Sequence, residues 1–240
     1  MLFRSDLQMA KYTVAVCDDE KEDLSFIVRK ITEYDTHQLF EIKTYTDGEL
    51  LFDELKSQKT SIDLLLLDIE MPSNGFQLAR TLQALPKHPM VIFVTRQHEY
   101  AVQGYGIAFR YLTKPLNNLL FKSAMDAATQ ELASRRFLVE CDGGTLSLET
   151  ANIYYIESYG HTILVHSKGK DFQLRMNIQD AAKQLPKRCF TAPHRCYLVN
   201  MEHILYTSSD EIMLSNGAKL PISRRKRQEF NQAFNTYLGR

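Results

Sequence analysis

Five polar residues stand at the ends of four apolar segments in the first half of the chain. Asp18 and Asp19 follow 13–17, Asp68 follows 62–67, Thr95 ends 90–95, and Lys114 comes just after 109–112. If these segments are parallel strands of one sheet, the polar residues gather at one edge, where such sheets bind ligands. Two carboxylates at about 4 Å repel each other by roughly 4 kcal/mol at an effective dielectric near 20, so a cation must offset them. Lys114 and a divalent metal ion are the candidates.

The chemistry that this set allows is phosphoryl transfer onto a carboxylate. Oxygen ligands with room for water suit Mg²⁺, which commonly joins one or two carboxylates to a phosphate. Asp68 would attack the phosphorus, Mg²⁺ and Lys114 would neutralise the phosphoryl oxygens, and Thr95 would donate a hydrogen bond to the product. One aspartate after a strand is more often a helix cap. All four elements in order favour the chemical interpretation.

The elements that must position these residues alternate between short apolar runs and amphipathic stretches. We expect strands at 13–17, 40–45, 62–67, 90–95 and 109–112, with helices between them and a last helix from about 117 to 133. Strands that are apolar on both faces indicate a parallel sheet covered by helices on each side. Right-handed crossovers then predict an α/β doubly wound parallel sheet of five strands over residues 12–130. Residues 1–11 are expected to be an N-terminal extension.

The pattern changes after a predicted linker at 131–136. From residue 137 to 240, short apolar runs alternate with turn signals every six to ten residues, and Asn216-Gly217 is the clearest hairpin signal. The expected strands are 138–141, 153–158, 163–166, 172–175, 197–199, 212–214 and 220–222. Two helices are expected, over 177–185 with Asn177 as its cap and over 223–238 with Ser223 as its cap. This half is therefore predicted to be a predominantly β domain.

Composition excludes several other classes of protein. The 240 residues are 44% hydrophobic and 24% charged, and no apolar run approaches the roughly 18 residues of a membrane helix. Four cysteines in a chain of this length do not suggest a disulfide scaffold, so we expect a cytoplasmic location. Residues 1–134 hold 14 Lys and Arg against 19 Asp and Glu, whereas residues 135–240 hold 15 against 10. This asymmetry suggests a second half that meets a polyanion.

The first half resembles the receiver domain of bacterial two-component response regulators. The similar segments are Val16–Glu20, Leu66–Pro72, Phe93–Thr95 and Tyr111–Pro115. The resemblance implies a flavodoxin-like domain in which Asp68 is the phosphoacceptor, charged by a sensor histidine kinase.

The resemblance also implies the roles of the neighbouring residues. Asp18, Asp19 and Asp68 would hold Mg²⁺ together with the backbone carbonyl of Glu70. Thr95 and Tyr111 match the family's switch pair of hydroxyl and aromatic ring. On sequence alone, Tyr111 is equally an ordinary half-buried strand residue.

Three positions depart from the receiver pattern. Pro72 and Gly75 stand one residue closer together than is usual, which shortens the loop beside Asp68. Arg96 occupies a position where a small residue normally leaves the phosphoryl group accessible. Arg110 replaces an aspartate that is common on the dimerising face. We expect these changes to affect the rate of phosphorylation and the geometry of a dimer.

The second half has a run of cations, Arg224 to Arg227, directly after Ser223. Cations in the first turn of a helix oppose its dipole, so contact with phosphates is the more economical explanation, and a solvated basic turn is the alternative. His161 and Arg195 lie in two further loops and carry groups that can contact base edges.

This half resembles the LytTR DNA-binding domain. The similar segments are Ile153–Ser158, His194–Asn200 and Leu220–Arg225. The resemblance implies an elongated β fold whose loops enter successive major grooves. His161, Arg195 and Arg224 would contact bases, and Arg225 and Arg227 would contact phosphates. Zinc coordination by Cys189, His194, Cys196 and His203 is disfavoured, because their spacing matches no common site.

The whole chain is therefore expected to be a cytoplasmic response regulator. Phosphorylation of Asp68 by the sensor kinase would drive homodimerisation and binding to double-stranded promoter DNA, with no membrane partner and no turnover catalysis. One alternative is DNA binding independent of phosphorylation, with the receiver used only for dimerisation. A second is a Mg²⁺-dependent aspartyl-phosphate phosphatase, although Glu70 stands where such enzymes usually have an aspartate. A third is a protein-binding output module with an acidic partner.

Overall fold

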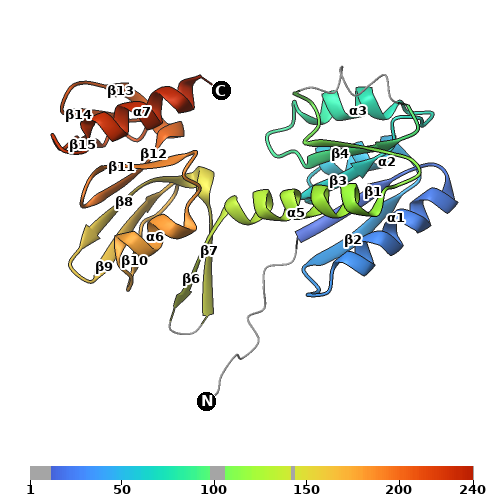
Figure 1. The fold of residues 1–240 in the computed structure, drawn as a ribbon, viewed down its shortest axis with the longest axis horizontal. Coiled ribbons are helices and arrows are strands. Elements are labelled where there is room, and N and C mark those ends of the chain that lie inside the picture. The colour runs from blue at the N-terminus through green and yellow to red at the C-terminus, as the bar shows by residue number, and fades with distance from the viewer. Residues whose placement is uncertain (1–11, 98–105, 142–143, 240) are drawn as a thin grey trace, which may run out of the picture. The chain divides into compact units, whose positions relative to one another are not determined.

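The computed structural model describes residues 12–97, 106–141 and 144–239. These residues form two units, which divide along the chain between Gln130 and Glu131. Figure 1 shows one sheet with helices in the first unit and several sheets with two main helices in the second. No helix in the described ranges is both long and apolar enough to span a membrane.

Five parallel strands form the sheet of the first unit, in the order β2-β1-β3-β4-β5. They are β1 (Tyr12–Cys17), β2 (Phe40–Tyr45), β3 (Leu64–Leu67), β4 (Met90–Thr95) and β5 (Arg110–Thr113). All residues of β3 and β4 are buried, as expected for strands covered on both faces. The prediction of a doubly wound parallel sheet is confirmed.

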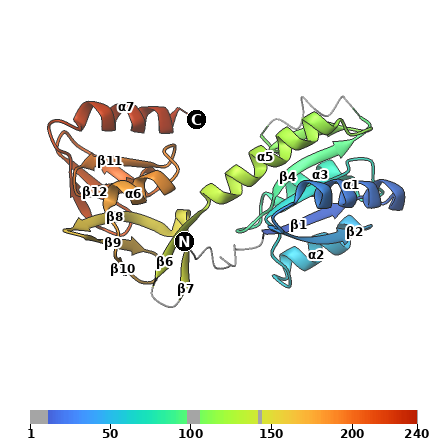
Figure 2. The same cartoon turned by 60° about the horizontal axis from the view of Figure 1, so that its bottom comes forward.

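Helices cover both faces of this sheet (Figures 1 and 2). They are α1 (Lys21–Tyr34), α2 (Gly48–Lys56), α3 (Gly75–Leu82) and α5 (Asn118–Ser134). On one face, α2 and α3 pack Leu51, Phe76 and Leu82 against β1, β3 and β4. On the other face, the hydroxyl of Tyr34 in α1 donates a hydrogen bond of 2.9 Å to Asp126 of α5.

The segment predicted as a linker at 131–136 is not a separate element. Helix α5 continues through Ser134 and β6 begins at Arg136, so one residue lies between helix and strand. The helix continues because Leu132 extends its apolar face and is 2% exposed. The carboxylate of Glu131 pairs with the guanidinium of Arg188, which lies in the same unit.

Antiparallel strands dominate the second unit. Its five-stranded sheet has the order β10-β9-β8-β12-β11, and a three-stranded sheet and a hairpin accompany it. The strands are β6 (Arg136–Cys141), β7 (Gly144–Glu149), β8 (Ile153–Tyr159), β9 (Thr162–Ser167), β10 (Phe172–Leu174), β11 (Phe190–His194), β12 (Tyr197–Asn200), β13 (Ile204–Thr207), β14 (Glu211–Leu214) and β15 (Lys219–Pro221). Two helices, α6 (Ile178–Gln184) and α7 (Arg227–Leu238), pack on them. The predominantly β prediction is confirmed.

Strand β12 belongs to two hydrophobic cores. Leu198 packs with Phe190 and with Ile178 of α6, whereas the next residue, Val199, packs with Ile212 and with Phe230 of α7. Successive side chains of a strand point to opposite faces, so β12 is covered on both.

Buried Asn200 fixes the end of β12. Its side-chain amide donates to the carbonyls of Thr150 and Ile153, at 3.2 and 3.0 Å. Both faces and the end of the strand are therefore tied to the rest of the unit.

Three strands of the second unit were not predicted: β7, β11 and β13. Pro193 lies inside β11, where the register is irregular, and a proline argues against a regular strand in sequence analysis. The turn at Asn216-Gly217 does join β14 to β15, with Gly217 at a φ of 84°. Asn177 does cap α6, because its side chain accepts a hydrogen bond of 2.8 Å from the amide of Asp180.

The predicted start of the last helix is wrong. Helix α7 begins at Arg227, and Ser223 is not its cap. Residues 223–226 form a turn in which the amide of Lys226 donates to the carbonyl of Ser223 at 3.0 Å. The amide of Ser223 donates instead to the carbonyl of Pro193 in β11, which holds the turn against the sheet. Of the four consecutive cations, only Arg227 is therefore in the first turn of α7.

The short loop after β3 returns very close to the strand it left. A Cβ atom on Gly75 would lie 1.8 Å from the carbonyl oxygen of Asp68, so no side chain fits there. Asn74 caps α3 by accepting from the amide of Gln77 at 3.2 Å. The start of α3 thus packs directly on the backbone of Asp68.

We predict that Gly75→Ala lowers the free energy of unfolding by about 1–3 kcal/mol, because backbone atoms must move to admit the methyl group. Chemical denaturation of the purified chain measures the change. Gly239→Ala is the matched control, since its Cβ would meet nothing closer than 3.5 Å. Equal unfolding energies for Gly75→Ala and the wild type would contradict this account of the loop.

Candidate functional site

The carboxyl edge of the five-stranded sheet holds a cluster of polar side chains. Asp18 follows β1, Asp68 follows β3, Thr95 ends β4 and Lys114 lies one residue beyond β5. Backbone hydrogen bonds continue past the strand ends, from Asp68 to Cys17 at 3.0 Å and from Lys114 to Thr95 at 2.9 Å. Asp18, Asp68 and Thr95 are all buried, at 0%, 3% and 0% exposure. The predicted convergence of these residues is what the structure shows.

Lys114 is the buried cation that holds this cluster together. Its Nζ lies 2.7 Å from Asp18 Oδ2, 2.7 Å from Asp68 Oδ2 and 2.8 Å from Asp23 Oδ2. Burial alone would lower the pKa of Lys114, but hydrogen bonds to Asp18, Asp23 and Asp68 outweigh it and hold the pKa above its usual value. The ammonium group is therefore charged at neutral pH.

Burial in this cluster disfavours the charged form of Asp18. Burial raises the pKa of Asp18 above its usual value, although the hydrogen bond from Lys114 opposes the shift. The amide of Glu20 also donates to Asp18 Oδ1, at 3.0 Å. The amide of Glu70 similarly donates to Asp68 Oδ1, at 3.1 Å. Backbone amides thus orient the two carboxylates as well as stabilising their charge.

Asp18, Asp19 and Asp68 could hold a metal ion. One carboxylate oxygen from each lies within 4.8 Å of the other two, and Asp19 is exposed to solvent. An all-oxygen, anionic donor set open on one side fits a hard cation such as Mg²⁺. The position of the Glu70 carbonyl as a further ligand stays a prediction.

The proposed switch residues occupy different surroundings. Thr95 Oγ1 accepts from the amide of Gln97 at 3.4 Å and lies 3.5 Å from a carboxylate oxygen of Glu70. The hydroxyl of Tyr111 donates to the carbonyl of Gln97, and its ring packs edge-on against Phe93 with centroids 6.2 Å apart. Thr95 is thus part of the buried cluster, whereas Tyr111 is half-buried beside it. Their role as a switch pair stays a prediction.

Two departures from the receiver pattern have defined contacts. The guanidinium of Arg96 pairs with Glu20 and Asp23 at the start of α1. The guanidinium of Arg110 lies 4.5 Å from the centroid of the Phe109 ring and is exposed. Arg110 is therefore on the surface of the unit, away from the buried cluster.

Sequence analysis missed Asp23, which contacts both Lys114 and Arg96. An acidic residue in a first helical turn is ordinarily explained by the helix dipole, so the residue type alone did not indicate that Asp23 belongs to the site. Its position four residues after Asp19, in the first turn of α1, was the available signal.

The cationic loops of the second unit gather at one end of its five-stranded sheet. His161 lies in the β8–β9 hairpin, Arg195 between β11 and β12, and Arg224 in the turn after β15. The amide of Ser158 donates to the carbonyl of Cys196 at 2.9 Å, which joins the first two loops. The bond from Ser223 to Pro193 joins the second and third.

Exposure separates the predicted DNA contacts into two groups. His161, Arg195, Arg224 and Arg225 are exposed. Arg227 is partly buried, and its Nε is buried without a hydrogen-bond partner. The turn before β12 is tight, because the amide of Cys196 donates to His194 Nδ1 at 3.2 Å, and it leaves Arg195 on the surface.

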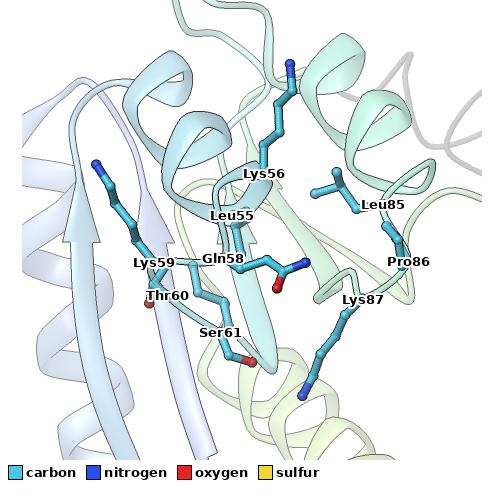
Figure 3. A pocket seen from close by; sticks show the side chains of 10 residues that line it. Leu55, Lys56, Gln58, Lys59, Thr60, Ser61, Leu85, Pro86 and Lys87 are labelled. Atoms are coloured by element: carbon cyan, nitrogen blue, oxygen red, sulfur yellow. The ribbon is translucent and has the colours of Figure 1, made fainter.

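A hollow lies at the opposite edge of the first sheet. It is lined by residues 55–62 and 85–87, which precede β3 and β4. Its three lysines, Lys56, Lys59 and Lys87, point away from one another (Figure 3). They do not converge as an anion-binding group would, so the hollow is not a second candidate site.

Comparisons with known proteins match both units. A family model of the response regulator receiver domain matches residues 14–126, and one of the LytTR DNA-binding domain matches residues 143–235. The sensory transduction protein LytT of Bacillus subtilis is 24% identical over 91% of this chain and 97% of its own length. The transcriptional regulatory protein YpdB of Escherichia coli K12 is 26% identical over 91% of this chain and 98% of its own length.

Solved structures of single domains are also similar. The response regulatory domain of protein mrkE from Klebsiella pneumoniae is 27% identical, with a TM-score of 0.46, over 50% of this chain and 97% of that one. A LytTR DNA-binding domain from Bacillus cereus is 21% identical, with a TM-score of 0.37, over 41% of this chain and 95% of that one.

We predict that Mg²⁺ raises the melting temperature of the protein and that Asp19→Asn largely removes this shift. A ligand that binds only the folded state stabilises it by about 2.7 kcal/mol at 100 times its Kd. Thermal unfolding with and without Mg²⁺ measures the effect. Asp19 is exposed, so its substitution should not disturb folding.

Glu49→Gln, in the first turn of α2, is the control and should keep the full shift. An undiminished Mg²⁺ response in Asp19→Asn would show that the metal binds elsewhere.

Proposed function

The chain belongs to the response regulators that join a receiver domain to a LytTR DNA-binding domain, and we propose that phosphorylation of Asp68 controls its binding to promoter DNA. Membership of this family makes it a transcription regulator. The phosphoacceptor, the metal, the dimer and the DNA contacts belong to the proposal.

The observation that supports phosphorylation most directly is the ion cluster around Lys114. A buried lysine within 2.7 Å of both Asp68 and Asp18 holds two carboxylates that would otherwise repel each other. The same ammonium group could stabilise the additional charge of a phosphoryl group on Asp68. A lysine needed only to stabilise the fold could be replaced, together with the two aspartates, by apolar residues at little cost.

In the proposed reaction, a carboxylate oxygen of Asp68 attacks the phosphorus of a phosphohistidine on a sensor histidine kinase. The P–N bond breaks, its electron pair stays on the histidine nitrogen, and that nitrogen takes a proton from solvent. Lys114 balances charge on the phosphoryl oxygens, and Thr95 donates a hydrogen bond to the product. Asp18, Asp19 and Asp68, with the carbonyl of Glu70, would bind Mg²⁺, which neutralises phosphoryl charge when present.

We interpret the protein as a regulator that is modified once per cycle rather than as a phosphatase. Glu70 is engaged by Gln97, whose side-chain amide donates to it at 3.0 Å. The matching relatives are described as regulators of sensory transduction and transcription, which agrees with this interpretation. A regulator of transcription that receives its phosphoryl group from a kinase would act in the cytoplasm.

The output step of the proposal is DNA binding by the three joined loops. His161, Arg195 and Arg224 would reach base edges, while Arg225 and Arg227 would contact phosphates. Phosphorylation would favour a homodimer, in which the second DNA-binding domain meets its site at a raised effective concentration. The three exposed loops lie at the same end of the sheet and can therefore follow the groove of a DNA duplex. This arrangement supports DNA as the partner better than it supports an acidic protein.

We predict that Asp68→Asn abolishes labelling by acetyl phosphate in the presence of Mg²⁺, because an amide does not attack phosphorus. Intact-mass spectrometry counts the phosphoryl groups. Asp126→Asn, an exposed carboxylate on α5, should label as the wild type does. Full-stoichiometry label on Asp68→Asn would overturn the assignment of the acceptor.

We predict that Arg195→Ala and Arg224→Ala each weaken specific promoter binding by about 10- to 100-fold, the usual effect of losing one base contact. Footprinting and titration of DNA at fixed salt measure the loss. Lys168→Ala is the control, because Lys168 follows β9 at the sheet end opposite His161. If both arginine variants protect promoter DNA as the wild type does, the loops are not the DNA-binding surface.

A further inference from the structure

The side chain of Arg96 reaches across the strand that carries Asp68. Arg96 directly follows β4, while its partners Glu20 and Asp23 lie just beyond β1 and in α1. The order of the sheet is β1-β3-β4, so β3 and the Asp68 that follows it lie between them. Neighbouring strands are about 4.8 Å apart, and the arginine therefore spans about two strand separations.

Three charge-assisted hydrogen bonds hold Arg96 in this position. Its Nη1 lies 2.9 Å from Glu20 Oε1, and its Nη2 lies 3.0 Å from Glu20 Oε2 and 3.0 Å from Asp23 Oδ2. Two parallel bonds to one carboxylate fix the plane of the guanidinium, which a lysine could not do. The hydrogen bonds that Arg96 donates to Glu20 are the main cause of the raised pKa of Arg96, and the charge of Asp68 contributes too.

Arg96 forms an outer layer over the buried cluster. The same Oδ2 atom of Asp23 accepts from Arg96 and, at 2.8 Å, from Lys114 beneath it. Next along the chain, Gln97 donates to Glu70 at 3.0 Å, on the loop that follows β3. Two consecutive residues therefore tie the end of β4 to the loops after β1 and β3, on either side of Asp68.

We propose that Arg96 is a gate over the phosphoacceptor, held shut by Glu20 and Asp23. This inference rests on the proposed function. Arg96 is a positioning residue: it does not react, but its ion pairs must open before a phosphoryl donor, or later a water molecule, reaches Asp68. The gate therefore slows both the gain and the loss of the phosphoryl group.

Both reactions use defined reactants. With acetyl phosphate, the Asp68 carboxylate attacks phosphorus, the P–O bond to the acetyl group breaks, and acetate leaves with the electron pair. In the hydrolysis that removes the phosphoryl group, water attacks the phosphorus of the acyl phosphate and the carboxylate of Asp68 leaves. Inorganic phosphate forms and keeps both protons of the water molecule. Access to the same phosphorus governs each step.

The test compares rates in the full-length chain at saturating Mg²⁺. Arg96→Ala is expected to accelerate labelling by acetyl phosphate, and also hydrolysis after the donor is removed, by about two- to tenfold, in line with exposed ion pairs. Arg96→Lys, which keeps the charge but loses the bidentate contact, should give intermediate rates. Arg80→Ala, an exposed arginine on α3, is the matched control and should leave both rates unchanged.

A second variant separates gating from a general effect on stability. Glu20→Gln weakens the ion pair that holds Arg96 in place and should accelerate both reactions. It should have no further effect when combined with Arg96→Ala. Thermal unfolding of each variant, measured in parallel, reports any loss of folding that could alter the rates by another route.

The outcomes distinguish the gate from the function on which it rests. If the wild type takes no label, the proposed phosphorylation fails and the gate falls with it. If the wild type labels at Asp68 but Arg96→Ala shows unchanged or slower rates, only the gate is overturned. A slower reaction would mean that Arg96 assists the transfer. The gate would also be overturned if Glu20→Gln accelerated labelling and hydrolysis equally in the wild type and in the Arg96→Ala variant.

Discussion

The ion cluster centred on Lys114 is the constraint on which the first domain depends. Asp18 and Asp68 are almost completely buried at the ends of neighbouring strands, and Lys114 lies 2.7 Å from each. Removing one member of a buried ion pair leaves an uncompensated charge, which commonly costs about 3–5 kcal/mol. A parallel sheet is well suited to the task, because each strand delivers its terminal residue to the same edge. The architecture and the chemistry are thus linked by a single electrostatic requirement.

The outer contacts show how the fold accommodates an arginine next to the buried cluster. The charge of Arg96 is balanced by Glu20, which precedes α1, and by Asp23 in α1. Asp23 joins this outer pair to Lys114, so the two layers share one carboxylate. An arginine at this position is therefore part of a connected network and not an isolated surface charge.

Sequence analysis predicted the parts of the structure that depend on local pattern. Short, largely apolar runs located the parallel strands, and polar residues at their ends identified the cluster. The segment predicted as a linker at 131–136 instead completes α5 and begins β6, because the burial of Leu132 depends on tertiary packing. The cap at Ser223 was wrong because that residue bonds to Pro193, thirty residues earlier. The roles of Asp23 and Glu20 were missed because their partners, Lys114 and Arg96, follow strands that are distant along the chain.

The double burial of β12 has a consequence for how the second domain meets its ligand. Leu198 and Val199 face different cores, and Asn200 anchors the strand at its far end. The turn containing Arg195 leads straight into this strand, so it cannot shift without disturbing two hydrophobic clusters. Little conformational entropy remains to be lost there on association. If the ligand is a DNA duplex, most of the conformational change on binding must occur in the DNA. Sequences that deform easily would then be favoured, even at base pairs that no side chain contacts.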